Sequence, residues 1–186
     1  NSSYSEKYIN FFYRPNNSEI HNDINLLFNK KYLDNLPKIN NKFLILGASS
    51  GIGLDLSTYL SFIDQKVTAT YRSKHNLLKE RIKILDKHNK TFDFFRYESN
   101  DKFPVNLCDF DVIVDFITPK IMRGSKIDLS YELFRDFSDS YIKHLLEIAF
   151  ELSNYNKNFL LVIPSTVAIN EIPIGMIEYS ASKAAL

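Results

Sequence analysis

Tyr179 and Lys183 have the residue types and the spacing for proton transfer. They lie four residues apart in the stretch YSASKAAL, so on a helix they share one face, one turn apart. A free tyrosine has a pKa near ~10 and is a poor acid or base at neutral pH. A neighbouring ammonium favours the phenolate and lowers that pKa toward the working range. The pair therefore predicts a tyrosine general acid/base supported by a lysine, although ordinary surface helices carry the same spacing.

Two hydroxyl side chains, Ser165 and Thr166, follow an apolar run at residues 158–163. If this run is a strand of a parallel sheet, its carboxyl end is where the sheet presents groups to a ligand. A hydroxyl there can hydrogen-bond a substrate carbonyl oxygen. A serine or threonine at a strand end also commonly caps a helix or turn, so the residues alone leave both interpretations open.

A glycine-rich turn, GASSGIG, follows the apolar run at residues 43–46. Gly47 permits a tight turn, Gly51 lets the backbone approach a diphosphate, and Gly53 lets the next helix pack close to the strand. The N-terminus of that helix presents unpaired N–H groups to phosphates. The spacing G-x-x-x-G-x-G also fits a turn that holds no ligand. The candidate cofactor-binding residues of the turn are Gly47, Ser49, Ser50, Gly51, Ile52 and Gly53.

The end of the next apolar run, at residues 66–71, bears on the choice of cofactor. NAD-specific sites commonly place an acid here to bind the ribose hydroxyls, whereas an arginine accommodates a 2′-phosphate. Tyr71 stands at the place of that acid and is followed by Arg72 and Lys74. We therefore expect NADP(H) rather than NAD(H), with Arg72 as the contact. The alternative is that the two cations are solvated loop charges.

The elements that must position these residues alternate along the chain. Short runs that are apolar throughout indicate strands covered on both faces, and segments with helical spacing of apolar residues lie between them. The pattern predicts an α/β fold with a doubly wound parallel sheet. The expected strands are residues 43–46, 66–71, 92–95, 111–117 and 158–163. The expected helices are residues 52–63, 77–85 and 133–152, the last with an apolar stripe at Leu133, Phe134, Phe137, Tyr141, Leu145, Ile148 and Leu152.

Two segments of the chain differ in composition. Residues 1–40 are rich in Asn, Lys and Tyr, and we interpret them as an N-terminal extension or linker with one short amphipathic helix at residues 19–32. Residues 41–186 form the expected dinucleotide-binding domain. We expect the extension to be dispensable for cofactor binding, because the glycine turn needs only the strand before it and the helix after it.

The composition also bears on partners and location. A net charge of +1, from 23 basic and 22 acidic side chains without a dense basic cluster, does not indicate a nucleic-acid or anionic-membrane partner. The apolar runs are too short to span a bilayer. Cys108 is the single cysteine, so no internal disulfide can form, and we expect a cytoplasmic protein. We predict no metal site.

The glycine turn, the hydroxyl and YSASKAAL together resemble the short-chain dehydrogenase/reductase family, over roughly residues 42–186. The resemblance implies a Rossmann fold, a nicotinamide cofactor, a small carbonyl or alcohol substrate and a homo-oligomer. It implies that Tyr179 is the general acid/base and that Lys183 holds the nicotinamide ribose and lowers the tyrosine pKa. It also implies a hydroxyl that orients the carbonyl. Family spacing favours Thr166 for that role, with Ser165 second.

The chain departs from the family pattern in several places. The sequence DFIT at residues 115–118 replaces the usual Asn-Asn-Ala-Gly, and Ser138 or Asp139 falls where an asparagine supports the proton relay. The connection at residues 98–111 is too short for the customary helix. Family chains continue to a sixth and a seventh strand, so we expect this sequence to be a fragment of a longer protein. The competing interpretation is a dinucleotide-binding sensor or scaffold without turnover.

Overall fold

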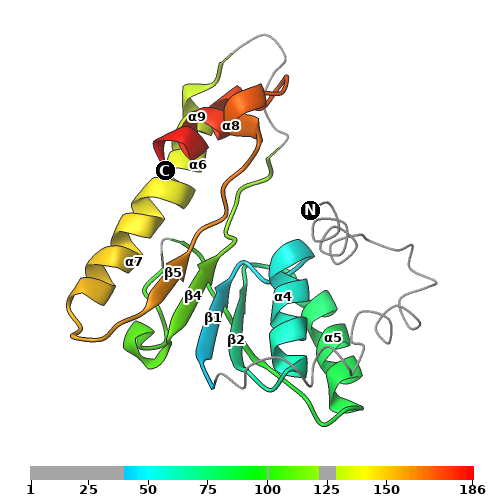
Figure 1. Cartoon of the computed structure of the whole chain (residues 1–186). Coiled ribbons are helices and arrows are strands. Elements are labelled where there is room, and N and C mark those ends of the chain that lie inside the picture. Colours follow the sequence, from blue (N-terminus) through cyan, green and yellow to red (C-terminus); the bar gives the residue numbers. More distant parts are fainter. Residues whose placement is uncertain (1–39, 100, 122–128) are drawn as a thin grey trace, which may run out of the picture. The chain divides into compact units, whose positions relative to one another are not determined.

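A computed structural model describes residues 40–99, 101–121 and 129–186. In these residues, parallel strands form one sheet in the order β3-β2-β1-β4-β5 (Figure 1). The chain runs outward from β1 to β3 and then crosses to the other side of β1 for β4 and β5. The expected doubly wound α/β fold is therefore confirmed. The strands are β1 (Lys42–Leu46), β2 (Lys66–Tyr71), β3 (Asp93–Arg96), β4 (Val112–Asp115) and β5 (Leu160–Val162).

Helices cover the two faces of this sheet. Helices α4 (Gly51–Phe62) and α5 (Asn76–Asp86) follow β1 and β2 and lie on one face, and α7 (His144–Ser153) lies on the other (Figure 1). Leu44 and Leu46 of β1 pack with Ile148 and Leu152 of α7. Ile45 points to the opposite face and packs with apolar residues of α4 and α5. These alternating contacts remove β1 from water on both faces, as its unbroken apolar run predicts.

A long helix precedes β5 and contains one wide turn. It comprises α6 (Tyr131–Ser138), a π-helical turn η3 (Asp139–Lys143) and α7. A π-turn holds one residue more than an α-helical turn, and such turns are frequent at functional sites. The buried stripe differs from the expected one: Phe134 and Leu145 are only partly buried, and His144, absent from the expected stripe, is buried. The buried residues are Leu133, Phe137, Tyr141, His144, Ile148 and Leu152.

Two helices complete the described chain. The short helix α8 (Ala168–Glu171) leads to α9 (Ile177–Ala185), which carries the YSASK sequence. Helix α9 packs against α6 and the π-turn (Figure 1). The cluster that joins them contains Leu133, Phe137, Tyr141, Ala168 and Tyr179.

Some predicted boundaries are wrong. Strand β4 ends at Asp115, before the predicted residue 117, because the Asp115 carboxylate accepts a hydrogen bond from the Ile117 backbone N–H at 2.9 Å and turns the chain. Strand β5 is also shorter than residues 158–163. It is not covered on both faces, since Leu160 is 57% exposed and Val162 39%.

Other expectations of the sequence hold or fall outside the described residues. The connection before β4 contains only a short 3₁₀ helix, η2 (Leu107–Asp109), as its length predicts. Strand β3 begins and ends one residue later than expected. The predicted helix at residues 19–32 lies outside the described residues, as does the expected extension except for its last residue, Asn40.

Candidate active site

The candidate site lies at the carboxyl ends of β1 and β4. These strands are neighbours in the sheet, and the chain leaves them in opposite directions. Doubly wound sheets bind their ligands in the crevice outside such a switch point. In this protein the glycine turn follows β1, and residues 116–121 follow β4. The predicted site residues are therefore best described from this edge of the sheet outward.

Gly47 has a conformation and surroundings that only glycine tolerates. Its φ is +75°, in the left-handed region. A Cβ atom there would lie 2.8 Å from the carbonyl carbon and oxygen of Phe116. The Gly47 N–H donates to Thr70 Oγ1 at 3.0 Å. The turn is thus fixed between the end of β2 and the loop that follows β4.

The turn also folds tightly onto the first turn of α4. Gly51 begins this helix with a φ of +62°. A Cβ atom on Gly53 would lie 2.8 Å from the Gly47 carbonyl oxygen. The Ser50 side chain is exposed, and Ile52 is 52% exposed. The backbone of the turn is therefore compact, while its outer side chains and the first helical N–H groups lie at the switch point.

Arg72 lies directly after β2 and is exposed. Its backbone carbonyl accepts a hydrogen bond from Arg96 Nε at 3.1 Å. Arg96 is paired with Tyr71 across the β2–β3 ladder, and its guanidinium forms an ion pair with Glu98. Two arginines, Arg72 and Arg96, therefore lie at the carboxyl ends of the neighbouring strands β2 and β3. The sequence interpretation missed Arg96, whose signal was its place at the end of the third strand.

Tyr179 and Lys183 share one face of α9, as their spacing predicts. Both residues are buried, with exposed fractions of 6% and 8%. The Tyr179 ring makes edge-on contacts with Phe137, at 5.6 Å between ring centroids, and with Tyr141, at 6.1 Å. These contacts fix the plane of the tyrosine ring. The roles of the two residues in proton transfer stay predictions.

The Lys183 ammonium has two direct partners among residues 40–99, 101–121 and 129–186. Its Nζ atom donates a hydrogen bond to the Pro164 carbonyl oxygen at 3.0 Å and lies 4.0 Å from the centroid of the Tyr141 ring. Burial lowers the pKa of Lys183 below its ordinary value, and the negative charge of Asp115 opposes this effect. Lys183 thus connects α9 to the segment between β5 and α8, where the two predicted hydroxyls lie.

Thr166 and Ser165 differ in what their hydroxyls do. Thr166 Oγ1 accepts a hydrogen bond from the Ala168 N–H at 3.2 Å and so closes the turn that leads into α8. The capping alternative therefore applies to Thr166. A hydroxyl that accepts from a backbone N–H still has its own proton to donate, so capping does not remove the predicted interaction with a carbonyl. Ser165 is exposed.

Three buried side chains at the end of β4 are joined by hydrogen bonds. The sequence interpretation missed two of them, His144 and Tyr97. Asp115 Oδ2 and His144 Nδ1 are 3.0 Å apart, and His144 Nε2 and the Tyr97 hydroxyl are also 3.0 Å apart. Because a carboxylate oxygen only accepts, His144 Nδ1 donates to Asp115, and Nε2 bonds the Tyr97 hydroxyl. Burial is the main cause that raises the pKa of Tyr97. His144 is invisible to apolar periodicity because it is polar at a buried helix position.

The residues at which the sequence departs from the family pattern contact the π-turn and α9. Thr118, the last residue of DFIT, has its Oγ1 hydrogen-bonded to the Tyr141 hydroxyl. Ser138 Oγ lies 3.3 Å from Ser182 Oγ, and the exposed Asp139 begins the π-turn. The loop after β4 is thereby linked to the π-turn, and the end of α6 to α9.

These contacts form a continuous path through the candidate site. Gly47 lies against the Phe116 backbone, and two residues later Thr118 bonds Tyr141. Tyr141 contacts both Tyr179 and Lys183, and Lys183 bonds Pro164. The path joins the glycine turn, the tyrosine–lysine pair and the segment that carries Ser165 and Thr166. Arg72 lies outside this path, at the end of β2.

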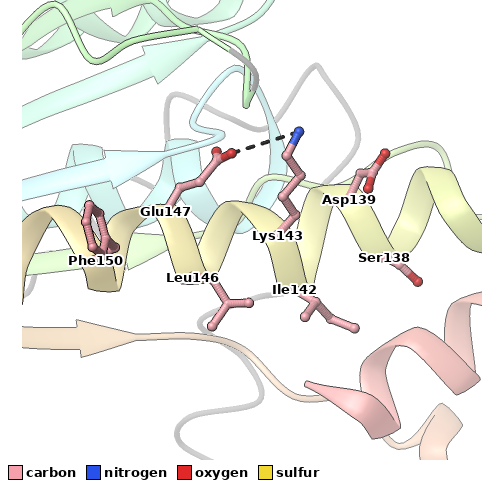
Figure 2. Close-up of a pocket in the computed structure, with 7 residues that line it drawn as sticks. All are labelled: Ser138, Asp139, Ile142, Lys143, Leu146, Glu147 and Phe150. Carbon is pink, nitrogen blue, oxygen red and sulfur yellow. Dashed lines mark ion pairs between the residues drawn. The ribbon is translucent and has the colours of Figure 1, made fainter.

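A separate pocket of about 460 Å³ lies on the face of the long helix. Figure 2 shows Ile142 and Leu146 pointing from the same side of that helix, with Lys143 and Glu147 paired nearby. None of the predicted catalytic or cofactor-binding residues lines it. The lining residues are Ser138, Asp139, Ile142, Lys143, Leu146, Glu147 and Phe150.

The described part of the chain contains neither a candidate membrane span nor a candidate metal site. None of its helices is both long enough and apolar enough to pass through a bilayer. In the same residues, no group of three or more His, Cys, Asp or Glu side chains is placed to hold a metal ion.

Comparisons with known proteins rest on structure. No family model matches the chain, and no curated protein matches it in sequence. Solved structures do match. The acetoin dehydrogenase from Enterobacter cloacae superposes with a TM-score of 0.63 at 13% identity, covering 80% of this chain and 64% of that one. A short-chain dehydrogenase from Burkholderia cenocepacia J2315, in complex with NADP, gives a TM-score of 0.61 at 21% identity and covers 78% and 63%.

A third match is the FolM alternative dihydrofolate reductase 1 from Brucella suis, also in complex with NADP. Its TM-score is 0.64 at 12% identity, covering 78% of this chain and 63% of that one. The chain thus spans less than two thirds of the length of each of these proteins. Its fold is that of the short-chain dehydrogenases, as the sequence resemblance predicts.

Proposed function

We propose that the chain belongs to an NADP(H)-dependent oxidoreductase of the short-chain dehydrogenase/reductase type, which interconverts a carbonyl and an alcohol of a small molecule. The observation that carries the proposal is the path of contacts from Gly47 to Lys183. The path connects the tyrosine–lysine pair to the glycine turn through residues 116–118 and Tyr141. A Rossmann fold by itself hosts many functions; a connection between a candidate proton-transfer pair and a turn suited to phosphates supports the oxidoreductase.

The glycine turn and the helix after it fit a dinucleotide. A diphosphate needs a close approach of the backbone and unpaired N–H groups. Gly47 and Gly51 have positive φ angles, and Gly53 has no room for a side chain. Arg72 lies at the edge where a 2′-phosphate would be bound. The cofactor supplies the hydride acceptor or donor when it is bound; the protein residues do the remaining work.

The proton would be handled by Tyr179. Its hydroxyl gives a proton to the carbonyl oxygen during reduction and takes it from the alcohol during oxidation. The charged Lys183 stabilises the phenolate that forms. Thr166, or Ser165 in its place, donates a hydrogen bond to the substrate oxygen and orients it. The ring contacts of Tyr179 with Phe137 and Tyr141 hold the phenol in one plane, which favours a fixed direction of transfer.

The competing function is a dinucleotide-binding module without turnover. It is favoured by Asp115, which stands where the family has asparagine and uses both carboxylate oxygens inside the protein. Retention of Tyr179, Lys183 and a hydroxyl after β5 favours the enzyme, since binding alone does not need these three groups.

Cofactor titration followed by turnover measurement tests the proposal. NADPH and NADH are titrated into the purified protein by calorimetry, and reduction of a panel of carbonyl compounds is then followed by NADPH absorbance. We expect NADPH to bind more tightly, and Tyr179→Phe to lose at least ~10²-fold in turnover with almost unchanged NADPH affinity. Absence of binding to either cofactor contradicts the proposal. Binding with no turnover on any substrate favours the binding module.

A further inference from the structure

Tyr141 occupies a position for which the family resemblance provides no role. It lies in the π-turn between α6 and α7 and is buried, with an exposed fraction of 4%. Its ring contacts the Tyr179 ring edge-on, and Lys183 Nζ lies 4.0 Å from its centroid. Its hydroxyl bonds Thr118 Oγ1. One side chain therefore contacts both predicted catalytic residues and the loop that follows β4.

The surroundings of Lys183 explain why this contact matters. A buried ammonium loses water and becomes easier to deprotonate, unless other groups compensate. Within the described residues, the direct partners of Lys183 are the Pro164 carbonyl and the Tyr141 ring, and no carboxylate forms an ion pair with it. The negative face of an aromatic ring attracts a cation, and this attraction is stronger where water is excluded.

We propose that Tyr141 is a positioning residue for Lys183. Its ring holds the lysine ammonium in the charged form beside Tyr179, and its hydroxyl anchors the ring to Thr118. The proposal rests on the proposed function, because the charge of Lys183 affects catalysis only if Tyr179 transfers the proton. Asp115 at the end of β4 acts on Lys183 electrostatically, the Tyr141 ring from the π-turn contacts its ammonium, and Tyr179 lies one turn away on the same helix.

The ionisation of Tyr141 itself is compatible with this role. Burial, as the largest cause, raises the pKa of Tyr141 to about 12. The phenol therefore stays neutral throughout the range in which the enzyme would work, and its ring presents an unchanged electron density to the ammonium. The anchor also has a structural consequence. Thr118 lies two residues after Phe116, whose backbone abuts Gly47, so the lysine is tied to the glycine turn through a short segment.

Nuclear magnetic resonance of lysine side chains measures the charge of Lys183 without any substrate. The protein is labelled with ¹³C and ¹⁵N at its lysines, the Lys183 signal is assigned by its loss in Lys183→Met, and its shift is followed with pH. We expect Tyr141→Leu to lower the pKa of Lys183 by roughly 0.4–1.5 units, the scale of a desolvated cation–π contact. Tyr141→Phe keeps the ring and should leave that pKa within a few tenths of a unit.

Phe137→Leu is the matched control. Phe137 is buried in the same cluster and contacts Tyr141 and Tyr179, but it is not a partner of the ammonium, so this variant should leave the Lys183 pKa unchanged. An unchanged pKa in Tyr141→Leu, or an equal fall in Phe137→Leu, overturns the proposal. If Tyr141→Leu does not fold, the wild-type spectrum decides. Methylene protons that lie over an aromatic ring resonate upfield, so those of Lys183 should be upfield of the signals of other lysines. Lys183 methylene signals at ordinary positions would overturn the proposal.

The two proposals fail in distinguishable ways. Suppose that the wild-type protein binds NADPH and that Tyr179→Phe abolishes turnover, but that Tyr141→Leu leaves the Lys183 pKa unchanged. The proposed function is then supported and the positioning role is wrong. If the pKa responds as expected but neither cofactor binds, the ring–ammonium contact is real and the proposed function is wrong.

Discussion

Asp115 uses both oxygens of its carboxylate inside the protein. One oxygen accepts from the Ile117 N–H and ends β4, and the other bonds His144, which in turn bonds Tyr97. The same carboxylate acts at longer range on Lys183. A single residue at the end of β4 therefore affects strand length, helix packing and the charge balance of the candidate site.

His144 should be important for stability because it satisfies two buried partners at once. Its side chain is 1% exposed. His144→Ala leaves the Asp115 carboxylate and the Tyr97 hydroxyl without their partner, which should cost roughly 3–5 kcal/mol of the free energy of unfolding. Urea unfolding followed by circular dichroism measures this loss. The exposed His88 provides the control, and equal losses for His88→Ala and His144→Ala would contradict the prediction.

Arg72 should determine the preference between cofactors. Arg72→Ala removes the cation expected at the 2′-phosphate, so NADPH binding should weaken by roughly 1.5–3 kcal/mol, the scale of a charge-assisted hydrogen bond. NADH lacks that phosphate, and its affinity should stay nearly constant. Calorimetric titration of both cofactors checks this. A matched Lys74→Ala variant, also at an exposed cation of the same loop, separates a specific contact from general charge.

At the scale of elements, the glycine turn depends on two independent constraints. Gly51 has a positive φ, Gly53 is crowded by the Gly47 carbonyl, and Gly47 has both the positive φ and the crowding. The strand, the turn and the helix are held together by these close approaches of backbone to backbone.

Alanine substitution should separate these constraints. Positive φ costs a non-glycine residue roughly 1–2 kcal/mol, and a Cβ atom 2.8 Å from backbone atoms forces the turn to move. Gly47→Ala should therefore lose the most stability and the most NADPH affinity, with Gly51→Ala and Gly53→Ala losing less. Thermal unfolding and calorimetry rank the three variants. A smaller effect for Gly47→Ala than for either other variant would contradict the prediction.

The sequence predicts the strands, the main helices and the tyrosine–lysine face because these depend on local apolar runs and spacing. It does not predict His144, Tyr97 or Tyr141 as parts of the site. These residues are separated along the chain and meet only after the sheet and the long helix have packed. The π-turn escapes detection for a related reason, since periodicity assumes a constant number of residues per turn. Asp115 was recognised as unusual, but its partners could not be read from its neighbours.

At the scale of the whole molecule, Asp111 joins three segments at the amino ends of the strands. Its carboxylate accepts from the Lys42 N–H at 2.8 Å and pairs with Lys157 Nζ at 2.8 Å. Its backbone carbonyl accepts from the Leu160 N–H at 2.9 Å. Asp111 thus connects β1, β4 and β5 at the amino ends of these strands, whereas the candidate site lies at their carboxyl ends.

Because these contacts need an ionised Asp111 carboxylate, the free energy of unfolding should depend on pH in the acidic range. The hydrogen bond from Lys157, as the largest cause, lowers the pKa of Asp111. A carboxyl whose pKa is lower in the folded state contributes stability above its unfolded pKa, and the contribution disappears as the pH falls through the folded pKa. The free energy of unfolding of Asp111→Asn should therefore fall less than that of the wild type between roughly pH 5 and pH 3. Parallel pH profiles in both proteins would contradict this.

The π-turn at Asp139–Lys143 also affects how this chain can be aligned with others. A turn that holds one additional residue is equivalent to a one-residue insertion within the helix. An alignment that passes through residues 131–153 without a gap can match a regular helix correctly on only one side of the turn. Against a chain whose helix is regular, a single gap therefore belongs inside these five positions, and its placement decides which residues on the two sides of the turn correspond.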